Sequence, residues 1–165
     1  MKSNQLLLLG IVIFVSSCCS FGGQKTEWRH EKKAISLQMI GDERLNLYQE
    51  KPHSLILCVY HLKDLNAFNQ MLDQKGGLPL LLDCGRFDPS VTYAKRFVLQ
   101  PRQKLEEAMD RTEGAKYVGV VAGYYDLRKE NSSRSIQVPL SIMNNPKKID
   151  IRLNLGPNAM EEIKE

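Results

Sequence analysis

The 165-residue chain lacks any apolar run long enough to cross a lipid bilayer. Its longest run, Leu6 to Val15, is interrupted by Gly10 and covers only ten residues, whereas a membrane-spanning helix needs about 20. A short apolar run that follows a positive residue, here Lys2, is typical of a secretory signal peptide. We therefore expect an exported protein whose first segment is removed.

The chain also lacks a concentration of charge of one sign. Its 23 Lys and Arg residues nearly balance 19 Asp and Glu residues, for a net charge of +4. The longest basic runs are the pairs Lys32-Lys33 and Lys147-Lys148. Proteins that bind nucleic acid usually concentrate their basic residues on one stripe. The pattern argues against nucleic-acid binding and indicates a soluble surface with mild attraction to acidic partners.

Motifs that carry catalysis or hold metals are missing. The three histidines, His30, His53 and His61, form no HExxH arrangement, and no serine stands in a GxSxG motif. Asp83 and Asp88 could do acid–base chemistry, but a polar turn after an apolar run also explains them. We interpret the chain as a non-enzymatic protein without cofactor, metal or small-molecule substrate.

Cysteine is scarce, and its four copies fall into two pairs. Cys18 and Cys19 follow the apolar run, and Cys58 and Cys84 lie in the body of the chain. The spacing of Cys58 and Cys84 is not that of a CxxC motif, so zinc and redox sites have little support. An exported domain can keep a disulfide, but Cys58 in an apolar run could also be a small buried hydrophobe. Both interpretations stay open here.

The segment Val15-Ser16-Ser17-Cys18 resembles a lipobox, the motif that the lipoprotein signal peptidase cleaves. It predicts a signal peptide at residues 1–17 and a lipid on Cys18. The alternative is an ordinary secretory signal cleaved near residues 20–23. Cys19 stands where an aspartate commonly retains lipoproteins in the inner membrane, so its presence favours the outer membrane.

The remaining chain is long enough for one domain with a substantial core. Residues 18–33 are mostly polar and predict a lipidated N-terminal tether. We expect the folded domain at residues 34–156 and a C-terminal tail at residues 157–165.

Alternation of apolar and polar residues predicts that the domain consists mainly of strands. In the first strand, for example, Ile35, Leu37 and Met39 share one face. The predicted strands cover residues 34–40, 55–62, 93–99, 116–125, 135–140 and 149–155, and residues 104–109 are either a strand or a short helix. Gly119 suggests a close backbone approach or a bulge.

One segment has helical spacing instead. In residues 64–74, Leu65, Phe68 and Met71 recur on one helix face, with Asp64 as a candidate N-cap. Residues 78–82 could be an edge strand or a packed loop. Together, these patterns predict an all-β fold with a small helical insertion, a β-sandwich of about seven or eight strands.

Four short motifs along this domain resemble the type VI secretion system outer-membrane lipoprotein family, TssJ. They occur in the family's order: Val59-Tyr60-His61-Leu62 with Ala67-Phe68, Phe97 to Pro101, Tyr117 to Ala122 with Tyr125-Asp126-Leu127, and Val138-Pro139-Leu140. The chain departs from the family pattern at Arg102, where Gly is usual.

The resemblance implies a transthyretin-like β-sandwich, anchored by lipid in the outer membrane and facing the periplasm. It also implies binding to the periplasmic C-terminal domain of the inner-membrane protein TssM, which would anchor the membrane complex of the secretion system. In the family, the loop between the first two strands makes this contact, and its counterpart here is Gly41 to His53.

Apolar and aromatic residues in a charged loop are what a protein interface needs. The predicted contact residues are Leu45, Asn46, Leu47, Tyr48, Gln49 and Glu50. As an alternative, Leu45 and Leu47 fold back and cap the core. A second functional hypothesis is an unrelated envelope lipoprotein that captures a periplasmic peptide or protein.

Overall fold

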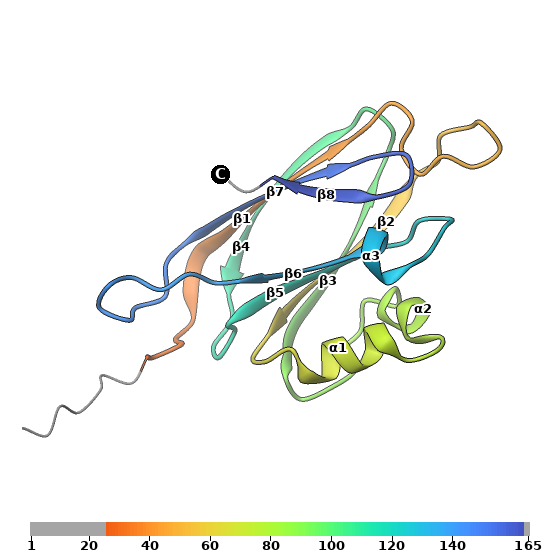
Figure 1. Cartoon of the computed structure of the whole chain (residues 1–165). Coiled ribbons are helices and arrows are strands. Elements are labelled where there is room, and N and C mark those ends of the chain that lie inside the picture. The colour runs from red at the N-terminus through yellow and green to blue at the C-terminus, as the bar shows by residue number, and fades with distance from the viewer. Residues whose placement is uncertain (1–25, 164–165) are drawn as a thin grey trace, which may run out of the picture.

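The computed structural model describes residues 26–163, so the predicted signal peptide and Cys18 lie outside the described residues. Within this range, no helix has both the length and the apolar character needed to span a membrane. Two four-stranded sheets pack face to face as a sandwich (Figure 1). The predicted β-sandwich of seven or eight strands is thereby confirmed.

The first sheet has the strand order β4-β1-β7-β8. Its strands are β1 (Glu31–Gly41), β4 (Lys104–Arg111), β7 (Ile149–Leu155) and β8 (Met160–Ile163). β1 runs antiparallel to β4 but parallel to β7, with Ile35 opposite Ile149 and Gly41 opposite Leu155. We call the end of the sandwich where β1 and β7 begin the proximal end, and the end where they finish the distal end.

The second sheet has the order β3-β2-β5-β6 and is antiparallel throughout. Its strands are β2 (Leu55–Leu62), β3 (Val91–Leu99), β5 (Tyr117–Ala122) and β6 (Ser133–Gln137). Between the sheets, Ile35, Leu37 and Met39 of β1 belong to one buried cluster with Leu57 and Val59 of β2. The predicted inward face of the first strand is thus the observed one.

Two helices cover the outer face of the second sheet, α1 (Asn66–Asp73) and α2 (Gly77–Leu81) (Figure 1). Residues 57–62 of β2 are therefore buried on both faces, and Tyr60 packs near Phe68 of α1 with ring centroids 6.0 Å apart. A Cβ atom on Gly119 would lie 2.9 Å from Phe68 Cζ. The close approach predicted from Gly119 is therefore present, and it lets α1 lie directly on the sheet.

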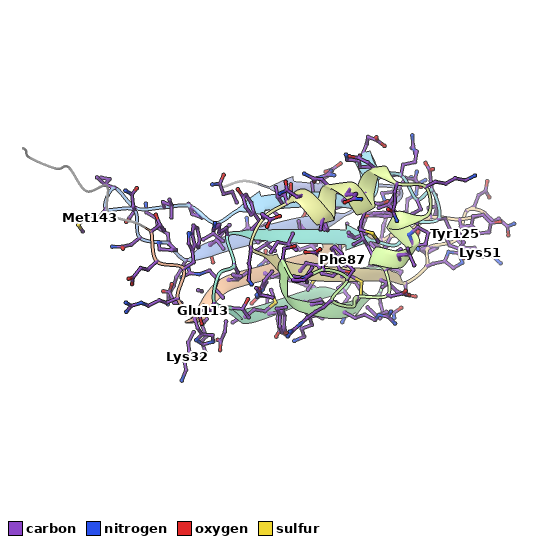
Figure 2. All side chains as sticks on the ribbon, turned by 90° about the horizontal axis from the view of Figure 1, so that it is seen from below. Lys32, Lys51, Phe87, Glu113, Tyr125 and Met143 are labelled. Carbon is purple, nitrogen blue, oxygen red and sulfur yellow. A yellow bond between two sulfur atoms is a disulfide. The ribbon has the colours of Figure 1, made fainter. Side chains whose placement is uncertain are left out.

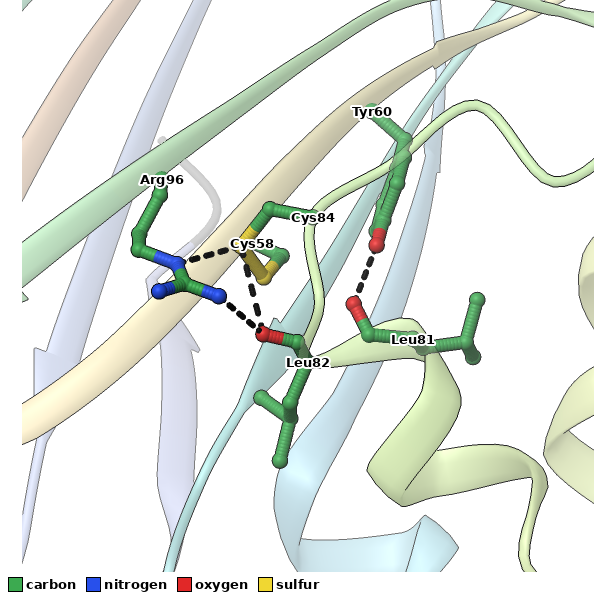
Figure 3. The surroundings of a disulfide bond; sticks show 6 residues. All are labelled: Cys58, Tyr60, Leu81, Leu82, Cys84 and Arg96. Atoms are coloured by element: carbon green, nitrogen blue, oxygen red, sulfur yellow. Dashed lines mark hydrogen bonds between the residues drawn. A yellow bond between two sulfur atoms is a disulfide. The ribbon is translucent and has the colours of Figure 1, made fainter.

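A disulfide joins Cys58 of β2 to Cys84, in the segment after α2, with Cα atoms 5.1 Å apart (Figure 3). The same segment is held by Arg96, whose Nη2 donates to the Leu82 carbonyl at 2.9 Å. The Tyr60 hydroxyl donates to the Leu81 carbonyl. Of the two interpretations of Cys58, the structure therefore shows the disulfide. This bond ties the helical insertion to strand β2.

Several elements differ from the predicted ones. Residues 78–82 fall mainly in helix α2, and Pro79 is tolerated because it lies in the first turn, where its missing N–H has no intrahelical partner. Residues 104–109 belong to strand β4. The predicted helix is α1, but its N-cap position is Leu65, and Asp64 instead accepts the N–H of Asn66 at 3.0 Å.

The first sheet also extends beyond both predicted domain boundaries. β1 begins at Glu31, inside the predicted tether, and β8 lies in the predicted C-terminal tail. β8 pairs with β7 at an edge of the sheet. β8 has only four residues, which is the minimum over which alternation of apolar and polar residues can predict a strand.

The buried side chain of Arg111 holds the segment before β1 against the proximal end. Its guanidinium forms an ion pair with Glu31 at 3.1 Å, donates to the Arg29 carbonyl at 3.2 Å and lies 5.8 Å from the ring centre of Trp28. Gly114 N–H also donates to the Trp28 carbonyl at 2.7 Å. The chain is therefore attached to the domain from Trp28 onward.

His61 of β2 is buried, and its ring packs on Tyr93 with centroids 4.7 Å apart. Its Nδ1 lies 3.3 Å from Thr112 Oγ1. Burial favours the neutral ring and lowers the pKa of His61 to about 4. These contacts are those of a structural histidine in a packed strand.

The lowered pKa predicts acid-dependent stability. In the unfolded chain, His61 titrates near its ordinary value of about 6.5, so its contribution is complete above that pH. It is lost as pH falls from there toward about 4, by roughly 2–3 kcal/mol of unfolding free energy at pH 4.5. Urea unfolding at pH 7.5 and pH 4.5 should show a smaller loss for His61→Gln than for the wild type. Equal losses in both proteins would contradict the prediction.

Candidate partner-binding surface

The loop that joins β1 to β2, residues 42–54, lies at the distal end beside the β7–β8 turn. Asn46 N–H donates to the Gly156 carbonyl at 3.3 Å, and Leu47 N–H donates to the Pro157 carbonyl at 2.8 Å. These backbone hydrogen bonds fix the loop to the end of the first sheet. The side chains of the loop therefore project from a backbone of fixed conformation.

Two of the six predicted contact residues point inward. Leu45 has no exposed surface and belongs to the core between the sheets. Asn46 is 5% exposed; its Nδ2 donates to the Ser54 carbonyl at 3.0 Å, and its Oδ1 accepts the Tyr125 N–H at 3.0 Å. The prediction that Leu45 and Asn46 form part of an exposed surface is therefore corrected. They shape the loop, because Leu45 gains burial in the core and Asn46 gains two backbone partners.

The outermost part of the loop is a tight hairpin turn from Tyr48 to Lys51. The Tyr48 N–H donates to the Lys51 carbonyl, and the Lys51 N–H donates to the Tyr48 carbonyl, both at 3.0 Å. The two central residues, Gln49 and Glu50, have φ values of 48° and 61°. Turns of this form normally contain Asn-Gly, because other side chains are strained at positive φ. The turn leaves Tyr48, Gln49 and Glu50 exposed, with Leu47 half-buried.

An exposed aromatic cluster lies at the base of this turn. The Tyr48 ring stacks on Tyr125 with centroids 4.2 Å apart and planes 11° apart, and His53 meets Tyr125 edge-on at 5.2 Å. Tyr48 is 44% exposed and Tyr125 is 54% exposed. Stacked rings that keep this much surface in water form a rigid apolar platform. We call Tyr48 and Tyr125 the distal tyrosine pair.

Tyr125 is not among the predicted contact residues, because the sequence predicts it as the last residue of a strand at residues 116–125. Tyr124 is buried, but Tyr125 stands at the distal end near Lys51 (Figure 2). A signal was available, since successive side chains of an extended chain point to opposite faces. This alternation favours different surroundings for Tyr124 and Tyr125 where only one face of the chain is covered.

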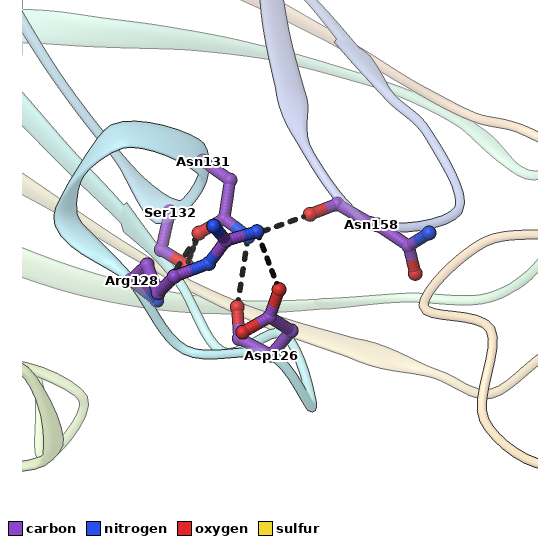
Figure 4. Close-up of polar contacts among 5 residues, drawn as sticks. All are labelled: Asp126, Arg128, Asn131, Ser132 and Asn158. Atoms are coloured by element: carbon purple, nitrogen blue, oxygen red, sulfur yellow. Dashed lines mark hydrogen bonds and ion pairs between the residues drawn. The ribbon is translucent and has the colours of Figure 1, made fainter.

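Asn131 holds the loop that carries Tyr125 in place (Figure 4). Its Nδ2 donates to the carbonyls of Asp126, at 2.8 Å, and of Asn158, at 2.9 Å. Its Oδ1 accepts the Arg128 N–H at 3.1 Å, and the residue belongs to the short helix α3 (Lys129–Ser132). Asn131 is 8% exposed. This buried amide therefore joins the Tyr125 loop to the β7–β8 turn, as Asn46 joins it to residues 42–54.

Charged residues surround a shallow hollow next to the distal tyrosine pair. The hollow measures about 490 Å³ and is lined by Glu43, Arg44, Leu47, Glu50, Pro52 and Arg102. Glu43 and Arg102 form an ion pair at 3.2 Å, with both side chains mostly exposed. Such a pair adds little to folding stability, so both charges can serve a partner. Arg102, a departure from the family pattern, adopts a positive φ of 64°.

Of the two carboxylates weighed as catalytic candidates, Asp88 belongs to a backbone turn. Asp88 accepts the Ser90 N–H at 2.7 Å, which lowers the pKa of Asp88 and closes a turn before β3. Among residues 26–163, no group of three or more His, Cys, Asp or Glu side chains is arranged to hold a metal ion.

Comparison with known families decides the affiliation of the chain. The family described as "Type VI secretion lipoprotein, VasD, EvfM, TssJ, VC_A0113" matches residues 33–158. The chain belongs to this family. The resemblance to the TssJ lipoproteins is thereby confirmed over nearly the whole folded domain. Comparison with curated proteins finds no match.

Solved structures share the fold of this TssJ-family chain. The lipoprotein TssJ1 from Pseudomonas aeruginosa has a TM-score of 0.60 and 19% identity, covering 83% of this chain and 96% of that one. Serratia marcescens Lip, a membrane-bound component of the type VI secretion system, has a TM-score of 0.59 and 19% identity, covering 79% and 97%. A chain described as "T6SS protein TssM C-terminal domain (869-1107) from EAEC" has a TM-score of 0.62 and 18% identity, covering 79% and 98%.

The strained turn predicts a stabilising substitution. Replacing Gln49 by Asn and Glu50 by Gly should raise the free energy of unfolding by about 1 kcal/mol, because both new residues accept positive φ more readily. Urea unfolding of the double variant measures the gain. Glu50→Ala, which keeps a Cβ at positive φ, is the control and should give no gain. A double variant no more stable than the control would show that the turn is not strained.

Proposed function

We propose that this type VI secretion lipoprotein anchors the membrane complex of the secretion system by binding the periplasmic C-terminal domain of TssM. The TssJ family is not a known enzyme family, and we propose a purely structural role. The observation that carries the proposal is the exposed distal tyrosine pair, held on a fixed loop in a chain of this family. The similar solved structures, which include one described as a type VI membrane complex, support the same partner.

The proposed contact consists of the distal tyrosine pair with Leu47, Gln49 and Glu50. Stacked tyrosines lose little side-chain entropy on binding and offer large apolar faces, which is why aromatic residues dominate interface energetics. Glu43, Arg44 and Arg102 form a charged rim that selects the orientation of the partner. Leu45 and Asn46 act indirectly, by shaping the loop.

The second part of the proposal is the location of the protein. Members of the family are membrane-bound lipoproteins, and we propose that Cys18 carries the lipid, in the outer membrane, with the domain facing the periplasm. A lipoprotein carries several acyl chains, and two or more chains give durable anchoring where one gives only marginal binding.

Removal of either ring of the distal tyrosine pair should weaken TssM binding. Tyr48→Ala and Tyr125→Ala should each raise Kd at least about tenfold, as expected for central aromatic residues of an interface. Calorimetric titration of the mature protein in detergent with the TssM periplasmic domain measures the effect. Thermal unfolding should change little, because both rings are about half exposed.

Two further variants control this experiment. Ile142→Ala removes a more exposed apolar side chain, from the loop between β6 and β7, and should leave Kd unchanged. Leu45→Ala should lower stability by about 2–5 kcal/mol, because it opens a cavity in the core. If wild-type protein fails to bind TssM at tens of micromolar while folded, the proposal is wrong, and capture of another periplasmic peptide or protein becomes the better hypothesis.

The lipid anchor is tested by Cys18→Ala. This variant should either accumulate as unprocessed precursor or leave the membrane fraction, whereas wild type should float with outer-membrane vesicles at mature size. The matched control is Cys19→Ala, which leaves the lipobox intact. A Cys18→Ala protein that still floats at mature size would refute lipidation at this residue.

A further inference from the structure

A second exposed apolar feature lies at the tip of the β6–β7 loop, residues 138–148. The loop is an ordered hairpin: Leu140 and Pro146 form a β-bridge, and Ser141 N–H donates to the Asn145 carbonyl at 2.8 Å. The Asn144 N–H donates to the Ser141 carbonyl at 2.9 Å, and Asn144 takes a positive φ of 57°. These bonds define a three-residue tip, Ile142-Met143-Asn144.

The composition of this tip is unusual for a turn. Ile142 is 104% exposed and Met143 is 71% exposed, the two largest values among the exposed large hydrophobic residues of the described chain. Turn positions normally hold Gly, Pro, Asn, Asp or Ser, which suit the backbone and solvent. Neither side chain contributes to the core of the domain. Only a surface outside the domain could bury them.

The loop projects from the proximal end, opposite the distal tyrosine pair. β7 begins at Ile149 directly after the loop, and its parallel pairing with β1 places this start beside Ile35. Figure 2 shows Met143 at one extreme of the molecule and Tyr125 at the other. β1 spans eleven residues, or about 35 Å at a rise of roughly 3.3 Å per residue.

The N-terminal segment leads from this same end to the proposed lipid anchor. Trp28 is fixed to the domain by Gly114 and Arg111, as described above. Thr26 follows Cys18 by eight positions, a separation of at most about 29 Å in a fully extended chain. Whatever the path of those residues, a lipid on Cys18 keeps the proximal end, and therefore the loop, close to the membrane surface.

Four exposed lysines lie at the same end of the molecule as the tip. Lys147 and Lys148 follow it, and Lys32 and Lys33 stand on the neighbouring strand β1 at the same end, all four exposed. None of the ion pairs among residues 26–161 involves these lysines. An apolar tip with exposed lysines at the same end of the molecule complements an anionic phospholipid surface, where the lysines meet headgroups and the tip enters the acyl boundary.

We propose that Ile142 and Met143 insert into the leaflet that holds the lipid anchor, so that the domain rests on the membrane through its proximal end. The proposal depends on the lipidation of Cys18 proposed above, and it adds a second contact with the bilayer. With two contacts the long axis of the sandwich is held away from the membrane. The distal tyrosine pair is then held about 35 Å into the periplasm by the length of β1.

The test uses mature lipidated protein in vesicles of phosphatidylethanolamine and phosphatidylglycerol with brominated acyl chains. In a Trp28→Phe background, which removes the single native tryptophan, Met143→Trp provides the probe and Tyr125→Trp the matched control. A side chain at the interface lies about 5–10 Å into the headgroup boundary, so the tryptophan at 143 should be quenched at least about twice as strongly as that at 125. Lys147→Glu with Lys148→Glu should reduce that quenching, less so in vesicles without phosphatidylglycerol.

The possible results separate this proposal from the lipid anchor. Protein that floats with vesicles but shows equal quenching at positions 143 and 125 overturns the insertion while the anchor stands. Protein that does not float overturns both. Blue-shifted emission at 143 without lipid quenching also overturns the insertion, since it would show that another protein or a second copy covers the tip.

Discussion

The parallel pairing of β1 with β7 is the constraint on which the arrangement of this molecule depends. Because the two strands run in the same direction, the segments that precede them meet at the proximal end, and those that follow them meet at the distal end. The segment from the proposed lipid anchor and the β6–β7 loop therefore share one end. The β1–β2 loop and the β7–β8 turn share the other.

Buried amides then convert this topology into a defined distal surface. Asn46 and Asn131 each satisfy backbone groups from two or more loops. Buried polar groups contribute most when all their hydrogen bonds are made. In both residues the side-chain nitrogen and the side-chain oxygen each have at least one backbone partner. The strained Gln49-Glu50 turn follows Asn46 closely in the chain. Because Asn46 links the loop of Tyr48 to the loop of Tyr125, the two rings can stack although both are exposed.

Much of the fold was predictable because its signals are local. The period-two pattern of Ile35, Leu37 and Met39 depends only on which face of a strand is buried, and helix α1 shows its own spacing of apolar residues. The elements that were missed, α2, α3 and β8, are short. Their stability comes from a disulfide, a buried amide and an edge pairing, which no window of sequence contains.

The sequence by itself determined the class of fold, the family resemblance, and the loop in which the candidate surface lies. Only the tertiary structure decided which side chains of that loop face a partner. Leu45 and Asn46 turned inward, and Tyr125, distant in sequence, joined Tyr48. The physical reason is that alternation records whether a residue is apolar, whereas exposure depends on what the rest of the chain places against it.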